Sequence, residues 1–213
     1  MTGPRAAAVP VLAWRDVTCA HGAHVVFSGF SGRLDAGERV RLVAPSGAGK
    51  TSFFDLLLGF ARPTAGEIRL LGRRLDEMPL AEARACVGAV LQESDLGGAG
   101  TVREALRAPF AFRVNRAAAP SEELLAETLG RLGLPRAVLD APAASVSGGE
   151  RQRLACAAAL LLPRRAWLLD EPFAALDAAN ARRVAEAFAD RTLLYTTHAD
   201  PVPGFATREV ALP

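Results

Sequence analysis

The stretch APSGAGKTS, residues 44–52, decides the fold of this chain. It contains Lys50, the single lysine among 25 lysine and arginine residues. A compact ammonium on a flexible stem can bridge phosphate oxygens as a point charge, whereas a planar guanidinium is wider and fixed in shape. One lysine can also survive by chance in an arginine-rich sequence. The residues around Lys50 therefore decide between a phosphate-binding lysine and one that survived by chance.

These neighbours match a phosphate-binding loop between a strand and a helix. The end of the pattern G-x-x-x-x-G-K-[ST] is matched by Gly47, Gly49, Lys50 and Thr51. The apolar residues 40–44 are predicted to form a strand, and residues 52–60 a helix that begins near Lys50. Ala44 stands where the pattern has its first glycine, at the exit of the strand. A glycine-rich turn before an ordinary helix is the alternative interpretation.

The chemistry expected of such a loop is anion binding. Glycines let successive backbone N–H groups turn inward around a phosphate, and the helix N-terminus adds the positive end of its dipole. We expect a nucleotide to contact the residues from the loop into the first helical turn: Ser46, Gly47, Ala48, Gly49, Lys50, Thr51 and Ser52. The Thr51 hydroxyl is the expected ligand for Mg²⁺.

Two adjacent carboxylates later in the chain support this interpretation. Residues 166–169 (AWLL) are predicted to form a buried parallel strand that ends at Asp170 and Glu171. Ligands of open α/β sheets bind at the carboxyl ends of the strands. Asp170 is therefore a candidate to hold Mg²⁺, directly or through a water, and Glu171 a candidate to polarise the attacking water. Seen alone, two acids at a strand end are more often part of a solvated loop.

The string VSGGERQR, residues 146–153, is the most specific pattern in the chain. Ser147 and Glu150 form the capping box S-x-x-E, which predicts a helix that begins after the serine. Its free N–H groups, behind two glycines, can approach a phosphate of another molecule with no side chain in the way. A well-capped helix without a ligand is the alternative.

The same string resembles the signature LSGGQ-x-x-R of the ATP-binding cassette (ABC) family, with Val146 for Leu and Glu150 for Gln. The resemblance covers nearly all 213 residues. It implies an α/β fold: a P-loop NTPase (RecA-like) core with a mainly parallel sheet, an antiparallel β layer, and a helical subdomain over about residues 95–162. It also implies that two copies of the chain sandwich two ATP with Mg²⁺. In that sandwich Ser147, Gly148 and Gly149 of one copy contact the ATP of the other.

The resemblance assigns roles to further residues. Gln92 looks like the glutamine that reaches the metal and the attacking water, and His198, after the strand predicted at residues 193–197, like the histidine that contacts the γ-phosphate. Asp177 belongs to a stretch, AALD, that resembles the loop crossing the dimer interface, and the resemblance implies that Asp177 contributes to the nucleotide site. His21 stands where the family usually has an aromatic residue stacked on adenine, and an imidazole offers a smaller face than a phenol.

Length and composition predict one compact domain over residues 1–213. Half of the residues (50%) are hydrophobic, which is enough for a sizeable core. Residues 11–19 and 25–30 are predicted to be early strands, and residues 121–132 a helix capped by Ser121. Helical patterns dominate from about residue 95 to residue 162, and later segments alternate helix and strand.

Other features limit the partners and the location. Cys19, Cys86 and Cys156 have no metal or disulfide spacing and are typical of a reducing cytoplasm. The apolar run 154–162 is far shorter than the ~20 residues of a spanning helix, and Pro10 interrupts the apolar N-terminus, so we expect neither a membrane span nor a secretory signal. A net charge of +2 without a basic run predicts no nucleic-acid partner.

We therefore interpret the chain as the ATP-binding and hydrolysing subunit of an ABC transporter. It would drive a separate membrane permease from the cytoplasmic face of the inner membrane, and loop lengths are most similar to small iron-export cassettes, with compact efflux and lipoprotein-release cassettes as near rivals. A soluble cassette ATPase acting on DNA or ribosomes is one alternative, although such relatives usually carry coiled-coil insertions or a second cassette. A non-hydrolysing nucleotide-binding subunit is another, suggested by Ala44 and His21.

Overall fold

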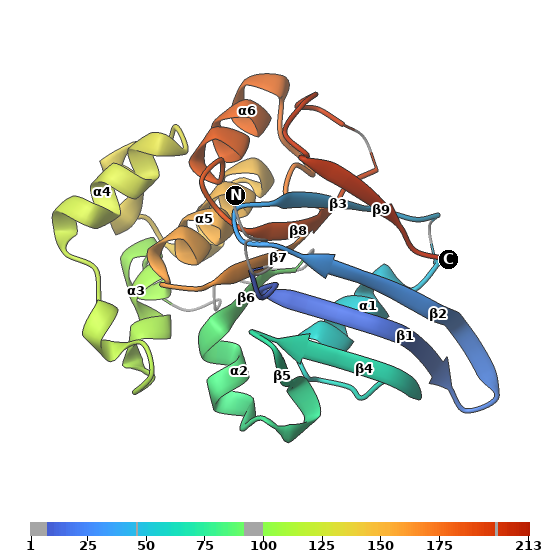
Figure 1. Cartoon of the computed structure of the whole chain (residues 1–213). Helices are drawn as coiled ribbons and strands as arrows, with labels where there is room; N and C mark the ends of the chain where they lie inside the picture. Colours follow the sequence, from blue (N-terminus) through green and yellow to red (C-terminus); the bar gives the residue numbers. More distant parts are fainter. Residues whose placement is uncertain (1–7, 46, 92–99, 199) are drawn as a thin grey trace, which may run out of the picture.

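The fold consists of a parallel sheet and an antiparallel sheet with helices packed against them. The computed structural model describes residues 8–45, 47–91, 100–198 and 200–213 (Figure 1). The antiparallel sheet has the order β2-β1-β4-β5: β1 Leu12–His21, β2 His24–Leu34, β4 Ala65–Leu70 and β5 Arg73–Arg74. The parallel sheet has the order β6-β7-β8-β3-β9: β3 Arg39–Val43, β6 Val87–Val90, β7 Ala166–Asp170, β8 Leu193–Thr196 and β9 Arg208–Ala211. These two layers confirm the predicted α/β class.

The helices lie on both faces of the parallel sheet. Their bounds are α1 Lys50–Leu57, α2 Leu80–Cys86, α3 Val102–Arg107, α4 Glu122–Arg131, α5 Gly148–Leu161 and α6 Ala178–Ala187. Helices α3 to α6 gather on the side away from the antiparallel sheet, whereas α1 lies behind β1 and β2 (Figure 1). The described part of the region predicted to be helical, from residue 100 to residue 162, contains α3, α4 and α5 joined by short 3₁₀ turns.

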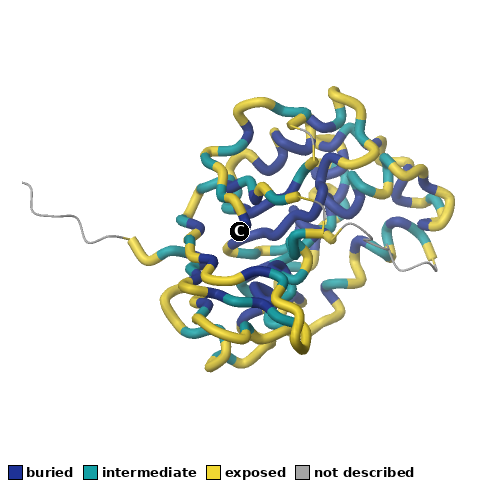
Figure 2. The backbone as a smooth tube through the Cα atoms, turned by 90° about the vertical axis from the view of Figure 1, so that its right-hand side faces the viewer, coloured by how far each residue is buried: buried dark blue, intermediate teal, exposed yellow. Residues whose placement is uncertain are grey.

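The side chains of strand β7 pack into two different apolar clusters, one on each face of the sheet. All of its residues are buried, and successive side chains of a strand point to opposite faces. Ala166 and Leu168 join the apolar cluster of α1 and the antiparallel sheet. Trp167 and Leu169 join the cluster formed with α3 to α6. Buried segments accordingly run through the middle of the molecule, while turns are exposed (Figure 2). A strand buried on both faces delivers its last residues to a fixed position.

An aromatic cluster fixes helix α1 on the antiparallel sheet. The Trp14 ring lies 5.3 Å from the ring of Phe53, which belongs to α1, and 5.5 Å from Phe30. Phe53 also packs edge-on against Phe27 and Phe30. Gly32 leaves room for the indole, because an added Cβ would lie 2.6 Å from Trp14 Cζ2. The antiparallel sheet therefore holds the helix that follows residues 44–52.

Element bounds differ from the sequence predictions at places with a local cause. Helix α1 begins at Lys50 as expected but ends at Leu57 rather than near residue 60, because Gly59 adopts a positive φ of 71° after the C-cap. Strand β2 is longer than the predicted 25–30 at both ends, because the two-residue turn after β1 pairs His24 with His21 and the pairing continues until Leu34 lies opposite Leu12. The helix predicted at 121–132 is confirmed as α4 with Ser121 as its N-cap.

Candidate functional site

The predicted phosphate-binding loop connects the carboxyl end of β3 to the N-terminus of α1. Gly47 and Gly49 have positive φ values of 78° and 93°, a region that favours glycine. At Gly49 a second constraint acts, because an added Cβ would lie 2.4 Å from Val26 Cγ1 on β2. The glycines of the motif are thus required by backbone shape and by packing of the loop against the antiparallel sheet.

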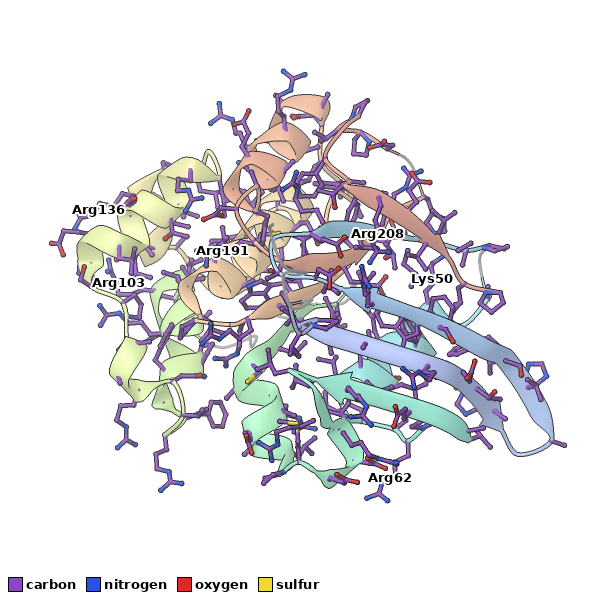
Figure 3. The ribbon with its side chains drawn as sticks, in the orientation of Figure 1. Lys50, Arg62, Arg103, Arg136, Arg191 and Arg208 are labelled. Atoms are coloured by element: carbon purple, nitrogen blue, oxygen red, sulfur yellow. The ribbon has the colours of Figure 1, made fainter. Side chains whose placement is uncertain are left out.

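Lys50 is the first residue of α1 (Figure 3). Its Nζ donates hydrogen bonds to the carbonyl oxygens of Ala44, at 3.1 Å, and Pro45, at 3.3 Å. Ala44 has no positive φ, and its methyl group packs against the apolar cluster of α1 and the antiparallel sheet. The substitution of alanine for the first glycine of the pattern therefore introduces no backbone strain at the strand exit.

Strand β7 ends in the two predicted carboxylates, and both are buried. Asp170 is 6% exposed and Glu171 is 7% exposed. Asp170 Oδ1 accepts a hydrogen bond of 2.6 Å from the hydroxyl of Thr196, which ends the neighbouring strand β8. The same hydroxyl accepts a 3.0 Å hydrogen bond from the Glu171 N–H. The order β7-β8 in the sheet thus fixes the position of both acids.

Glu171 also contacts His198, the residue predicted to follow β8. The Glu171 Oε2 atom accepts a hydrogen bond of 3.2 Å from the His198 N–H, and Oε1 lies 3.5 Å from His198 Nε2. Oε1 is buried and accepts no hydrogen bond from any described residue. A buried acceptor without a donor costs roughly 1–3 kcal/mol. This oxygen is therefore available for a proton-bearing group such as a water.

One polar pocket joins these segments. It has a volume of about 300 Å³ and is lined by Gly47, Gly49, Lys50, Thr51, Ser52, Asp170, Glu171 and His198. Residues separated by more than a hundred positions in the sequence thus line one cavity, which contains the ammonium of Lys50, the N-terminus of α1 and two carboxylates. The ammonium and the helix N–H groups suit phosphate oxygens, and the carboxylates suit a divalent cation. Ser46 and Gln92, both predicted to belong to the site, lie outside the described residues.

The pocket also fits Mg²⁺, which keeps most of its coordination for waters and phosphates. Among the described residues no group of three or more histidine, cysteine, aspartate or glutamate side chains is arranged to hold a metal. The Thr51 hydroxyl and the Asp170 carboxylate line the same pocket. One or two protein oxygens together with substrate phosphates are the usual environment of Mg²⁺ in nucleotide-dependent enzymes.

His21 lies at the edge of this site rather than in the pocket lining. It is the last residue of β1, and its Nε2 atom is 3.5 Å from the hydroxyl oxygen of Ser52 in the first turn of α1. The imidazole is exposed. This position is compatible with a base bound beyond the phosphates, so stacking of His21 on adenine stays a prediction.

The capping box predicted at residues 147–150 is confirmed. The Ser147 side chain accepts a hydrogen bond from the Glu150 N–H at 3.3 Å, and Glu150 Oε2 accepts from the Ser147 N–H at 2.9 Å. The Ser147 hydroxyl also donates to Glu150 Oε2 at 2.7 Å, and this bond, together with the bond from the Ser147 N–H, lowers the pKa of Glu150. An added Cβ at Gly148 would meet nothing within 4 Å. The N-terminus of α5 is therefore rigidly capped and open in front of Gly148, outside the pocket.

Asp177 has a structural role that the resemblance did not assign. It caps α6, with Oδ1 accepting from the Asn180 N–H at 2.8 Å and Oδ2 from Asn180 Nδ2 at 3.0 Å. The loop before Asp177 lies against the N-terminus of α5, as shown by the 3.2 Å between an added Cβ at Gly149 and the Ala175 carbonyl oxygen. The D-x-x-N spacing is an N-cap signal present in the sequence. A contact between Asp177 and a nucleotide stays a prediction.

Two further residues contact the site and were not predicted. Thr196 bonds to both acids, as described above, and Gln152 Nε2 donates to the carbonyl oxygen of Glu171 at 3.4 Å. A threonine at the end of an otherwise apolar strand is a signal that could have indicated Thr196. Gln152 had no such signal, because its contact depends on how α5 packs beside β7.

Comparisons with known proteins agree with this geometry. The sequence model of the ABC transporter family matches residues 27–174. The cytochrome c biogenesis ATP-binding export protein CcmA of Aromatoleum aromaticum is 36% identical over 200 residues, covering 90% of this chain and 90% of the relative. CcmA 2 of Salmonella paratyphi A is 34% identical over 205 residues, covering 93% of this chain and 95% of the relative.

Solved structures show the same fold. A structure described as the ATP binding subunit of an ABC transporter has a TM-score of 0.84 and 25% identity, covering 95% of this chain and 85% of the other. CbiO1 from Clostridium perfringens, at 20% identity, shares the fold with a TM-score of 0.81 over 95% of this chain and 84% of the other. No helix among the described residues has the length and hydropathy needed to cross a membrane. The chain belongs to the ABC transporter family, as the ATP-binding and ATP-hydrolysing subunit of a transporter.

Proposed function

We propose that this subunit hydrolyses Mg-ATP in the 300 Å³ pocket, as part of a dimer that powers export through a separate permease. The pocket is the observation that carries the proposal, since it brings the phosphate-binding loop together with Asp170, Glu171 and His198. Thr51 and Asp170 would hold Mg²⁺, which would supply positive charge against the negative charge that develops on the phosphates. Lys50, Asp170 and Glu171 line this pocket together, as binding of a phosphate and a metal ion requires.

Each side chain has a distinct role in this proposal. Lys50 neutralises the β- and γ-phosphates, and Thr51 and Asp170 hold the metal, with Gln92 as a further ligand. Glu171 accepts the proton of the attacking water through Oε1, the oxygen that no described residue hydrogen-bonds. His198, whose side chain is 65% exposed, is free to turn toward the γ-phosphate.

The open N-terminus of α5 supports a role in a second copy of the chain. Ser147, Gly148 and Gly149 lie outside the pocket that contains Lys50. Within one copy they cannot complete that pocket, yet the N–H groups of Gly148 and Gly149 at the helix N-terminus and the space in front of Gly148 suit an anion. Two copies arranged head to tail would place each signature over the other's loop, with the stretch of residues 174–177 between them.

A mixture of two inactive variants tests this arrangement. Lys50→Ala removes the phosphate ammonium, and Ser147→Arg blocks the N-terminus of α5 with a bulky cation, so each homodimer loses both composite sites. In the heterodimer both lesions fall on one site. We expect ATPase activity to reappear in the mixture. As a companion, cysteines placed at Ser46 and Gly148 of a protein free of other cysteines should crosslink between chains when ATP is added. Crosslinks that form only within one chain would contradict the sandwich.

A groove on the helical side supports the permease as a partner. It has a volume of about 490 Å³ and runs between β6, α3, the following 3₁₀ turn and α5. Its lining is mainly apolar and includes Phe112, which is 68% exposed. Arg84 and Arg164 also line it, and neither forms an ion pair with a described residue. Burial lowers the pKa of Arg164. The charge and shape fit a short apolar segment of the permease that carries a carboxylate.

Reversal of one groove charge tests this contact. Arg164→Glu should abolish the stimulation of ATPase activity by the permease and leave the activity of the isolated subunit unchanged, because Arg164 lies outside the nucleotide pocket. The assay uses the membrane protein that copurifies with the subunit, identified and reconstituted in liposomes. Reversal of the facing permease carboxylate to arginine should restore stimulation. Arg136→Glu, an exposed residue beyond α4, is the matched control (Figure 3). Unchanged stimulation in Arg164→Glu would place the permease elsewhere.

The names of the relatives support export, and a location at the cytoplasmic face of the inner membrane is part of the proposal. The CcmA relatives are export proteins of cytochrome c biogenesis by name. The similarity to iron-export cassettes, expected from loop lengths, does not appear in the names of these two relatives and stays a prediction. A single domain over residues 1–213, with its helical subdomain from about residue 95 to residue 162, is likewise part of the proposal. Measurable ATP hydrolysis by the purified subunit separates this function from a non-hydrolysing role.

A further inference from the structure

Thr196 is a polar residue buried at the end of an apolar strand, and it has no exposed surface (0%). Parallel pairing of β7 with β8 places it directly beside Asp170. Its hydroxyl oxygen lies 2.6 Å from Asp170 Oδ1 and 3.0 Å from the Glu171 nitrogen. The same hydroxyl therefore touches the side chain of one catalytic carboxylate and the backbone of the other.

The directions of these two hydrogen bonds are fixed by chemistry. A hydroxyl has one proton to donate and lone pairs to accept, a backbone N–H only donates, and a carboxylate only accepts. The Thr196 hydroxyl must therefore donate its hydrogen bond to Asp170 Oδ1 and accept a hydrogen bond from the backbone N–H of Glu171. With Oδ1 occupied in this way, the carboxylate plane is set and Oδ2 is the oxygen left for a metal or a metal-bound water. Hydrogen bonds to the oxygens of a ligating carboxylate fix its orientation.

The hydrogen bond from the Glu171 N–H to Thr196 forms at a residue with an unusual backbone conformation. Glu171 has a φ of 51°, which is uncommon for a residue with a side chain and persists only where the surroundings enforce it. The bond from its N–H to Thr196 and the contacts of its carboxylate with His198 come from the same neighbouring chain segment. The direction in which the Glu171 carboxylate leaves the strand therefore depends on the hydroxyl of Thr196.

We infer that Thr196 is a positioning residue for hydrolysis: its hydroxyl orients Asp170 toward the metal and Glu171 toward the attacking water. The inference rests on the proposed roles of those two acids. It differs from a packing role, which the methyl group of Thr196 and the surrounding apolar residues would fulfil without the hydroxyl. Valine keeps the shape of threonine and lacks the hydroxyl, so the two roles can be separated.

The experiment compares Thr196→Val with Thr196→Ser. In Thr196→Val we expect the Kd for Mn²⁺, used as a probe in place of Mg²⁺ and titrated by electron paramagnetic resonance with ATP present, to rise about 10-fold or more. The kcat for ATP should fall by about the same factor or more, and ATP binding in EDTA should stay within twofold. Thr196→Ser keeps the hydroxyl and should stay close to wild type in all three measurements. If the valine variant does not fold, Thr196→Cys, with a weak S–H donor, takes its place.

Two controls separate the possible failures. Thr128→Val removes another buried hydroxyl, which bonds to the Leu124 carbonyl within α4, and should leave Mn²⁺ affinity and kcat unchanged. Asp170→Asn tests the proposed function itself: if it leaves Mn²⁺ binding intact, the assignment of Asp170 to the metal is wrong. If Asp170→Asn abolishes Mn²⁺ binding while folded Thr196→Val matches wild type, the inference about Thr196 is overturned and the proposed function stands. The same conclusion follows if Thr196→Ser is as impaired as Thr196→Val.

Discussion

Replacement of Glu171 by glutamine should lower the rate of ATP hydrolysis by about 100-fold or more, the usual contribution of a positioned general base. Glutamine keeps an oxygen that can accept the hydrogen bond from the His198 N–H, so the geometry of the pocket should persist. It cannot take a proton from water. ATP binding should remain, and the ATP-bound dimer should accumulate because it no longer turns over. Turnover is measured by phosphate release and the dimer by light scattering after gel filtration.

The matched control for this variant is Glu127→Gln. Glu127 lies on the exposed face of α4 and forms no ion pair within the described chain, so the loss of its charge should leave hydrolysis unchanged. Near-wild-type turnover in Glu171→Gln would contradict the assignment and would require another base. Loss of turnover together with loss of ATP binding would instead indicate that Glu171 supports the pocket rather than the chemistry.

The parts of the site that a sequence predicts best are those built by local geometry. The loop around Lys50 and the capping box of Ser147 depend on residues within a few positions of each other, and both have the predicted form. The end of α1 was placed too late because the apolar run continues to Phe60, whereas the turn at Gly59 had already ended the helix. Local patterns thus fix where a helix starts more firmly than where it stops.

Contacts between segments that are distant in the sequence could not be predicted from it. The bond between Thr196 and Asp170 exists because β8 lies beside β7 in a particular register, and neither fact can be obtained from the two short apolar strings. Strand β9 was not predicted as such: its residues alternate in burial at the edge of the sheet, and its pairing with β3 defines it. The groove with Arg164 is likewise a product of how α5 and the 3₁₀ turn after α3 pack beside β6.

Removal of the Lys50 ammonium should weaken the binding of Mg-ATP by about 10- to 100-fold, because a hydrogen bond to a charged group contributes about 1.5–3 kcal/mol. No other lysine exists to replace it. Hydrolysis by Lys50→Ala should fall below detection, since in the proposed site the lost charge faces the phosphates throughout the reaction. Isothermal titration calorimetry with Mg-ATP measures binding. Arg62→Ala, which removes one exposed positive charge outside the pocket, is the control and should bind normally (Figure 3).

The stronger form of this prediction concerns Lys50→Arg, which keeps the charge and changes only its shape. The ammonium of Lys50 reaches the carbonyl oxygens of Ala44 and Pro45 at 3.1 and 3.3 Å, so the loop encloses a compact group. A planar guanidinium is wider and directs its N–H groups in a fixed fork, which does not match a cradle closed by these carbonyls. We therefore expect arginine to restore little of the affinity and none of the turnover. Normal binding and hydrolysis by Lys50→Arg would show that charge alone suffices at this position, and that the survival of one lysine in an arginine-rich chain has no chemical cause.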